Sequence, residues 1–121
     1  MKALFDTNII IDYLNGEEKA KKEIELYDFC AISILTYLEI VNGLQGLNEI
    51  ETIKKFLYRF SIINFDLPIA ERAALLRKKY KLKISEGIIL ATAECNQCLL
   101  ITRNTTDFPQ TIPIVRVPYT L

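Results

Sequence analysis

Short apolar runs alternate along the chain with longer segments in which apolar residues recur every three or four positions. Short runs bounded by polar residues are typical of buried strands, whereas the recurring spacing is typical of helices that bury one face. Strands that alternate with helices favour an α/β fold with a mostly parallel central sheet flanked by helices. Strands are predicted over residues 2–5, 28–33, 61–66, 98–102 and 112–117, and helices over residues 9–14, 17–27, 34–47, 48–60, 68–80 and 86–96.

Local signals place the ends of several helices. Gly46 suits the end of the third helix, and Asn48 suits the N-cap of the fourth. Pro68 suits the first turn of the fifth helix, and Ser85 is a candidate cap for the sixth. The third and fourth helices are expected to form a hairpin over residues 34–60. An apolar stripe on the third helix is expected to belong to the core; it comprises Leu35, Leu38, Val41 and Leu44.

The length and composition are those of one ordinary domain. The chain has 121 residues and half of them are apolar, which is enough to bury a core. We therefore expect a single domain over residues 1–121. No apolar run is long enough to cross a bilayer, and the first residues do not resemble a signal peptide. A cytosolic protein that does not bind a membrane is expected.

The three cysteines, Cys30, Cys95 and Cys98, cannot all pair within the chain. Cys95 and Cys98 have the spacing of a zinc or redox pair. The chain has no histidine and no second such pair, so a zinc site would lack ligands. We expect all three cysteines to be small buried hydrophobic residues.

The 15 basic and 15 acidic residues balance, but they are separated along the chain. Residues 1–53 hold ten acids and four bases, whereas residues 54–83 hold nine bases and two acids. A zero net charge argues against indiscriminate coating of nucleic acid, but the basic segment permits a local phosphate-contacting patch. That segment is densest at "RKKYKLK", from Arg77 to Lys83.

Several acidic residues are predicted to meet at the carboxyl edge of the sheet, where ligands bind in open parallel sheets. Asp6 follows the first strand, and Asn104 and Asp107 follow the fourth. Glu86 begins the helix that leads into the fourth strand, and Glu39 lies in an apolar stretch of the third helix. Carboxylates gathered at one place repel one another unless a cation joins them.

Each of these acids also fits an ordinary structural role, and the residues alone leave both interpretations open. Asp6 suits the cap of the helix that follows it, and Glu86 suits the first turn of its helix. Asp107 suits a turn, and Glu39 suits the polar face of its helix beside Asn42.

The donor types point to one kind of cation and one kind of chemistry. Hard oxygen ligands without histidine or paired thiolates favour Mg²⁺ or Mn²⁺ over Zn²⁺. Such ions activate water and stabilise charge at phosphorus. Without histidine, no imidazole is available as a general base. The patterns of dinucleotide-binding, P-loop and serine-hydrolase sites do not occur in the sequence.

Four segments that carry these residues resemble the PIN-domain ribonucleases, and among them the VapC-type toxins of bacterial toxin–antitoxin pairs. The segments follow the order of the family and are "FDTNIIIDYLNG" (5–16), "ISILTYLEIVNGL" (32–44), "ISEGIILATA" (84–93) and "LLITRNTTDF" (99–108). The resemblance covers essentially the whole chain. It implies a PIN-like three-layer α/β sandwich that hydrolyses RNA with Mg²⁺ or Mn²⁺.

The resemblance also implies which residues form the site. The residues that match metal-binding and catalytic acids are Asp6, Glu39, Glu86 and Asp107, and those that match supporting polar residues are Asn8, Thr102 and Asn104. The family usually has Asp where this chain has Glu86. Glutamate keeps the charge but adds one methylene, which moves the carboxylate by roughly 1.5 Å.

Two functions are compatible with these residues. The leading hypothesis is a metal-dependent endoribonuclease that is the toxin of a toxin–antitoxin pair. The alternative is a catalytically weakened module, altered at Glu86, that still binds RNA or an antitoxin-like peptide. A receiver-like phosphoacceptor domain is less favoured, because it needs a lysine where the last strand has only Arg116. Candidates for contact with the RNA backbone are Arg77, Lys78, Lys79, Lys81, Lys83 and Arg103.

The resemblance further implies two protein partners. VapC-type toxins form homodimers and are neutralised by a cognate VapB-like antitoxin. The antitoxin lays a segment in a groove of the toxin and presents a basic side chain to the acidic pocket. By analogy, the helical hairpin 34–60 is the expected location of this groove.

Overall fold

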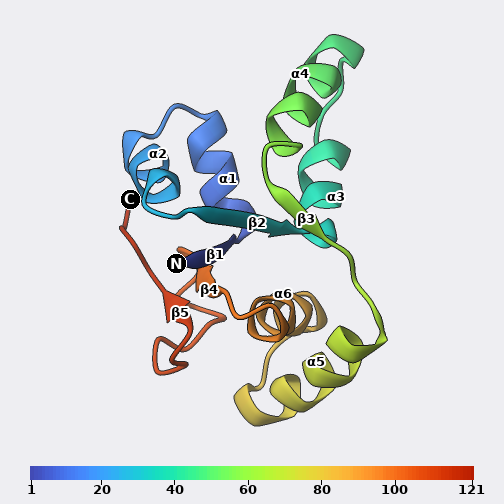
Figure 1. Cartoon of the computed structure of the whole chain (residues 1–121), viewed down its shortest axis with the longest axis vertical. Coiled ribbons are helices and arrows are strands. Elements are labelled where there is room, and N and C mark those ends of the chain that lie inside the picture. Colours follow the sequence, from blue (N-terminus) through green and yellow to red (C-terminus); the bar gives the residue numbers. More distant parts are fainter.

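A sheet of five parallel strands runs through the centre of the molecule (Figure 1). The computed structural model describes residues 1–121. The strand order is β3-β2-β1-β4-β5. The strands are β1 (Lys2–Phe5), β2 (Phe29–Ser33), β3 (Ser61–Ile63), β4 (Leu99–Ile101) and β5 (Val115–Arg116), and the helices are α1 (Thr7–Leu14), α2 (Glu18–Glu25), α3 (Ile34–Asn42), α4 (Leu47–Leu57), α5 (Leu67–Tyr80) and α6 (Ile84–Cys95).

Helices cover both faces of the sheet, so the structure has three layers. Helices α1 to α4 lie on one side and α5 and α6 on the other (Figure 1). Successive side chains of a strand point to opposite faces. Accordingly, Ala3 and Phe5 pack with Ile9 and Leu57 in one core, whereas Leu4 belongs to the core that contains α5 and α6. The predicted α/β class and PIN-like sandwich are confirmed, and the sheet is parallel throughout.

The chain changes direction across the sheet between β1 and β4. From β1 it adds β2 and β3 on one side, and it later adds β4 and β5 on the other. Phe5 is in register with Ile101, and the Asp6 amide donates a hydrogen bond to the Ile101 carbonyl (2.9 Å). Such a switch point leaves a crevice at the carboxyl ends of the strands. Asp6 follows β1 and Thr102 follows β4, so these two residues lie side by side at the opening of the crevice.

A buried ion pair attaches the last strand to α2. Glu23 is 5% exposed and accepts hydrogen bonds from Nε of Arg116 (2.7 Å), Nη2 of Arg116 (3.1 Å) and the Tyr27 hydroxyl (2.7 Å). Burial raises the pKa of Glu23, but the bonds from Arg116 and Tyr27 outweigh it and lower that pKa overall. Burial and the neighbouring carboxylate raise the pKa of Tyr27 to about 12, so its hydroxyl remains a donor.

The ends of three helices, α3, α4 and α6, differ from the sequence prediction. Helix α3 ends at Asn42 with Gly43 as its C-cap, so Gly46 does not terminate it. Gly46 is instead the N-cap of α4, and Asn48 lies inside that helix. Ser85 does not cap α6 either, because the helix begins at Ile84 with Lys83 as the N-cap residue. Small residues such as Gly46, Asn48 and Ser85 suit several adjacent cap positions. The sequence pattern therefore predicts that a helix exists more reliably than it predicts the residue at which the helix begins or ends.

The predicted core stripe on α3 is confirmed only in part, since Leu35 and Val41 pack against the core whereas Leu38 does not. Thr36 and Ile40 are the buried residues of this helix, whereas Leu38 is 60% exposed. A strict spacing of three falls about 60° short of a full turn at each step, so the stripe winds around the helix. Leu35, Val41 and Leu44 are only partly buried.

The cysteine prediction holds for one residue of three. Cys98 is buried, Cys30 is partly buried and Cys95 is exposed at the end of α6, and all three are free thiols. No helix is both long and apolar enough to span a membrane.

Close packing of α5 against α6 depends on Gly87. A Cβ atom at this position would lie 2.5 Å from Cγ of Arg77, whose Nε is bonded to the Leu82 carbonyl (3.0 Å). We expect Gly87→Ala to lower the free energy of unfolding by about 1–2 kcal/mol, measured by urea denaturation. Arg77→Ala in the same chain should restore most of the loss.

Gly43→Ala is the matched control. A Cβ there meets nothing nearer than 3.6 Å, so its effect should stay within about 0.5 kcal/mol. Equal stability of Gly87→Ala and the wild type would contradict the packing argument.

Candidate active site

A cavity of about 270 Å³ opens at the carboxyl edge of the sheet. Three of the four predicted acids line it: Asp6 after β1, Glu39 on α3 and Glu86 in the first turn of α6. Asn8 and Asn104 line it as well. The topology thus brings together residues from four distant segments, as the sequence analysis predicted.

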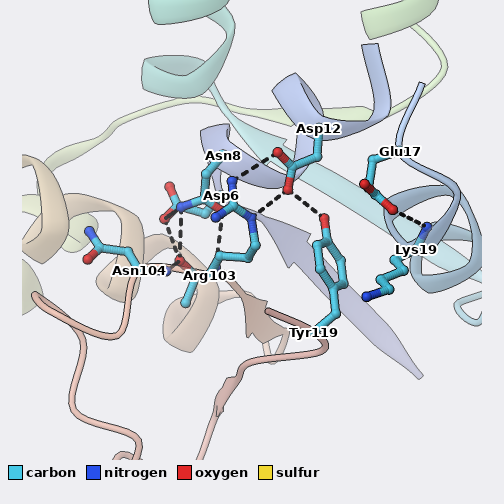
Figure 2. A network of polar contacts seen from close by, with 9 residues as sticks. Asp6, Asn8, Asp12, Glu17, Lys19, Arg103, Asn104 and Tyr119 are labelled. Carbon is cyan, nitrogen blue, oxygen red and sulfur yellow. Dashed lines mark hydrogen bonds and ion pairs between the residues drawn. The ribbon is translucent and has the colours of Figure 1, made fainter. Parts of the chain in front are cut away.

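Asp6 is held by three hydrogen bonds. Its Oδ1 accepts from the Thr7 amide (2.9 Å), which makes Asp6 the N-cap of α1. Its Oδ2 accepts from the Thr102 hydroxyl (2.7 Å) and from Nδ2 of Asn8 (3.2 Å), and Figure 2 shows Asp6 beside Asn8. Burial and repulsion from Glu86 raise the pKa of Asp6 although these bonds oppose them. The capping role and the place in the cavity are therefore compatible.

Glu39 and Glu86 complete the group of acids in the cavity. Loss of water contact, followed by repulsion from Asp6 and Glu86, raises the pKa of Glu39. Oε2 of Glu86 accepts from the Ser85 hydroxyl (2.9 Å), but Oε1 is buried and has no hydrogen-bond partner. A buried carboxylate oxygen without a partner is costly, and here its neighbours are also acidic.

Asp107 lies next to the cavity but does not line it. Its Oδ2 accepts from Nδ2 of Asn104 (3.0 Å), and its amide donates to Oδ1 of Asn104 (3.0 Å). Its Oδ1 is 3.9 Å from Nζ of Lys83. Asp107 therefore has the turn role, and its connection to the cavity is indirect, through Asn104.

The donor atoms fit a hard divalent cation, although they do not form a complete cage. No three acidic or thiol side chains lie close enough together to enclose a metal ion by themselves. Mg²⁺ characteristically uses one or two carboxylates and keeps several waters. The buried, unpartnered oxygen of Glu86, beside Asp6, is a position where such an ion would relieve both repulsion and desolvation.

The basic candidates are distributed unevenly around the cavity. Arg103 is paired with Asp12 through Nε (2.6 Å) and Nη2 (2.9 Å), so its charge is already partnered within the protein. Arg77 is committed to the Leu82 carbonyl. Lys78 and Lys79 are exposed at the end of α5 and do not line the cavity. The side chain of Lys83 lies near the cavity, because its Nζ is 3.9 Å from Oδ1 of Asp107.

Several residues of this region were missed by the sequence analysis. Thr7 and Ser85 line the cavity. Asp12 and Tyr119 form a buried network with Arg103, in which the Tyr119 hydroxyl donates to Oδ2 of Asp12 (2.8 Å; Figure 2). A lone acid inside the apolar run "NIIIDYL" was the signal available for Asp12.

Comparisons with known proteins agree with this geometry. The sequence profile of the PIN domain matches residues 3–111, and the chain belongs to the PIN-domain family. Its fold is similar to that of a chain in a toxin–antitoxin complex from Klebsiella pneumoniae, with 44% identity, a TM-score of 0.93 and coverage of 99% of this chain and 100% of the other. The resemblance to the PIN-domain family is thereby confirmed.

More distant structures share the fold. A chain of FitAcB from Neisseria gonorrhoeae is 24% identical with a TM-score of 0.77, covering 98% of this chain and 99% of that one. A chain of DNA-bound VapBC from Salmonella typhimurium is 21% identical with a TM-score of 0.78, covering 96% of each chain. No match was found among curated proteins.

Neutralising Glu86 tests the electrostatics of the cavity. We expect Glu86→Gln to raise the free energy of unfolding in chelator by about 1 kcal/mol, because it removes an unpaired buried charge. Excess Mn²⁺ should stabilise the wild type by about 2.7 kcal/mol at 100 times its Kd, and the variant by much less. Thermal unfolding with and without Mn²⁺ measures both effects.

Glu71→Gln, an exposed change on α5, serves as the control and should alter neither quantity by more than about 0.5 kcal/mol. A less stable Glu86→Gln protein that responds to Mn²⁺ like the wild type would contradict the assignment.

Proposed function

We propose that this protein is an Mg²⁺- or Mn²⁺-dependent endoribonuclease and the toxin of a toxin–antitoxin pair. The observation that carries the proposal is the meeting of Asp6, Glu39 and Glu86 in one cavity, where one carboxylate oxygen is buried without a partner. Membership of the PIN-domain family supports it. So does the 44% identity to a chain of a toxin–antitoxin complex.

The side chains of the cavity have separate roles in this proposal. Asp6 and Glu86 would hold the cation, with Asp107 as a further ligand, and Glu39 would remain free to act as a base. When bound, the ion supplies charge stabilisation at the phosphate and activates water. The amides of Asn8 and Asn104 orient Asp6 and Asp107.

Glu39 is suited to take the proton that the attacking water loses. Its raised pKa makes its carboxylate a stronger base than an ordinary glutamate, and the chain contains no histidine for this task. Lys83 lies beside the cavity and would contact the RNA backbone, which predicts binding that weakens as salt rises.

RNA cleavage by the purified protein tests the nuclease. The wild type should cleave RNA in Mg²⁺ or Mn²⁺ and stop in EDTA. We expect Asp6→Asn and Glu86→Gln to slow cleavage at least about 100-fold, because each removes a charge that acts in the transition state. Glu71→Gln should retain wild-type activity. Equal cleavage by the wild type and Asp6→Asn would refute the role of Asp6.

One observation favours the alternative of a binding module. The cavity lacks a ready-made three-ligand cage, and one oxygen of Glu86 is tied to Ser85. Absence of Mn²⁺ binding in calorimetry, together with intact RNA binding, would support this alternative. Glu86→Asp distinguishes the two further, since restored metal binding in that variant would show that the longer side chain had weakened the site.

An apolar groove leads away from the cavity and suits an antitoxin segment. It has a volume of about 310 Å³, lies between α1, α3 and α4, and shares Ile11 and Glu39 with the cavity. Leu14, Ile40, Leu44 and Ile53 provide its apolar lining, and Glu49 adds charge. We propose that the antitoxin places an apolar segment here and a basic side chain toward the acids. The homodimer implied by the resemblance stays a prediction.

Charge introduced into the groove tests the antitoxin site. Leu44→Asp should weaken the complex with the product of the adjacent antitoxin-like reading frame about tenfold or more, because it places an unpaired carboxylate in the apolar contact. Leu75→Asp, on the exposed side of α5, should bind like the wild type. Calorimetry measures both affinities, and equal binding by the two variants would contradict the groove assignment.

A further inference from the structure

Asp12 is a buried acid that the proposed reaction does not use. It lies on α1, is 6% exposed and accepts three hydrogen bonds: two from Arg103 and one from the Tyr119 hydroxyl. Figure 2 shows the three side chains meeting beside Asp6 and Asn8. The network joins α1 to the loop after β4 and to the C-terminal tail.

This network is connected to the cavity through the backbone of Arg103. The backbone N–H of Arg103 donates to Oδ1 of the Asn8 side chain (3.1 Å). This bond fixes the orientation of the side chain, so that its Nδ2 donates to Oδ2 of Asp6 (3.2 Å) and to the Thr102 hydroxyl (3.3 Å). The next residue is Asn104, whose backbone N–H donates to the Thr102 hydroxyl (3.0 Å). Its side-chain Nδ2 donates to Oδ2 of Asp107. The position of Arg103 thus sets the orientation of the polar groups on both sides of it.

Stability alone does not account for a charge at this position. A buried ion pair is often no more stable than apolar residues of the same volume, and α1 is otherwise apolar on its buried side. What the pair provides is a fixed geometry, because a planar guanidinium bound through two nitrogens has little freedom to rotate.

We propose that Tyr119 and Arg103, joined through Asp12, are positioning residues that hold the Asn8–Asp6 pair and the loop 103–107 in the geometry needed for the cation. The inference rests on the proposed metal site and extends it to the C-terminal tail. Hydrogen bonds that orient the ligands of a metal typically alter its affinity 10- to 100-fold when they are lost.

The protein contains its own matched control. Tyr27, Glu23 and Arg116 form a second network of the same chemistry around a buried carboxylate. That network reaches the cavity only through the sheet, where the Thr102 amide donates to the Arg116 carbonyl (3.1 Å). Tyr27→Phe and Tyr119→Phe therefore remove equivalent hydroxyls, of which only one is connected to Arg103.

Mn²⁺ titration and amide hydrogen exchange of the two full-length variants test the inference. Both variants should lose a similar amount of stability, because each removes one hydrogen bond to a buried carboxylate. Tyr119→Phe should weaken Mn²⁺ binding about tenfold and accelerate exchange of the Arg103 amide, whereas Tyr27→Phe should leave both within about twofold. Arg103→Lys, which keeps the charge but not the paired donors, should weaken Mn²⁺ binding as Tyr119→Phe does.

Mn²⁺ affinity and Arg103 exchange that are the same in Tyr119→Phe and Tyr27→Phe would overturn the inference and leave a purely structural network. A wild type that binds no Mn²⁺ and cleaves no RNA would instead overturn the proposed function. The exchange of the Arg103 amide decides the positioning role in either case, because it does not require the metal.

Discussion

Repulsion among the carboxylates that meet in one cavity is the constraint on which this structure depends. Asp6 and Glu39 both have pKa values raised by burial and by acidic neighbours, and Glu86 adds a buried oxygen without a partner. Such an arrangement lowers stability unless a cation joins the group. The rest of the fold supplies enough apolar burial on both faces of the sheet to tolerate it.

Two of the acidic residues in and beside the cavity also stabilise the local backbone, which offsets part of the stability lost to repulsion. Asp6 caps α1 while it lines the cavity, and Asp107 closes a turn with Asn104. Hydrogen bonds to Asp6 oppose the effect of burial on its pKa without cancelling it. A side chain in this position is therefore held in place by the backbone around it, which keeps its geometry defined before any ligand arrives.

The sequence predicted the class of fold, because the strands are short apolar runs whereas the helices repeat their apolar residues every three or four positions. It also predicted that Asp6, Glu86 and Asn104 would meet, since residues that follow parallel strands leave the sheet at one edge. It was right only in part about the α3 stripe, because spacing alone did not reveal that Thr36 and Ile40 are the buried residues and that Leu38 is exposed. It also did not reveal the ion pair of Arg103 with Asp12, because a partner 91 residues away in the chain is invisible to a local pattern.

The sequence by itself determined the alternation of elements, the parallel sheet and the identity of the acids that follow its strands. The alternation of elements follows from the local pattern of apolar residues. The parallel sheet follows because strands that alternate with helices are buried between two helical layers. Only the tertiary structure decided which charges are free and which are paired, since Asp12, Arg103 and Tyr119 come from three separate segments. Whether a charge is available for function depends on its neighbours in space, and those are set when the layers pack.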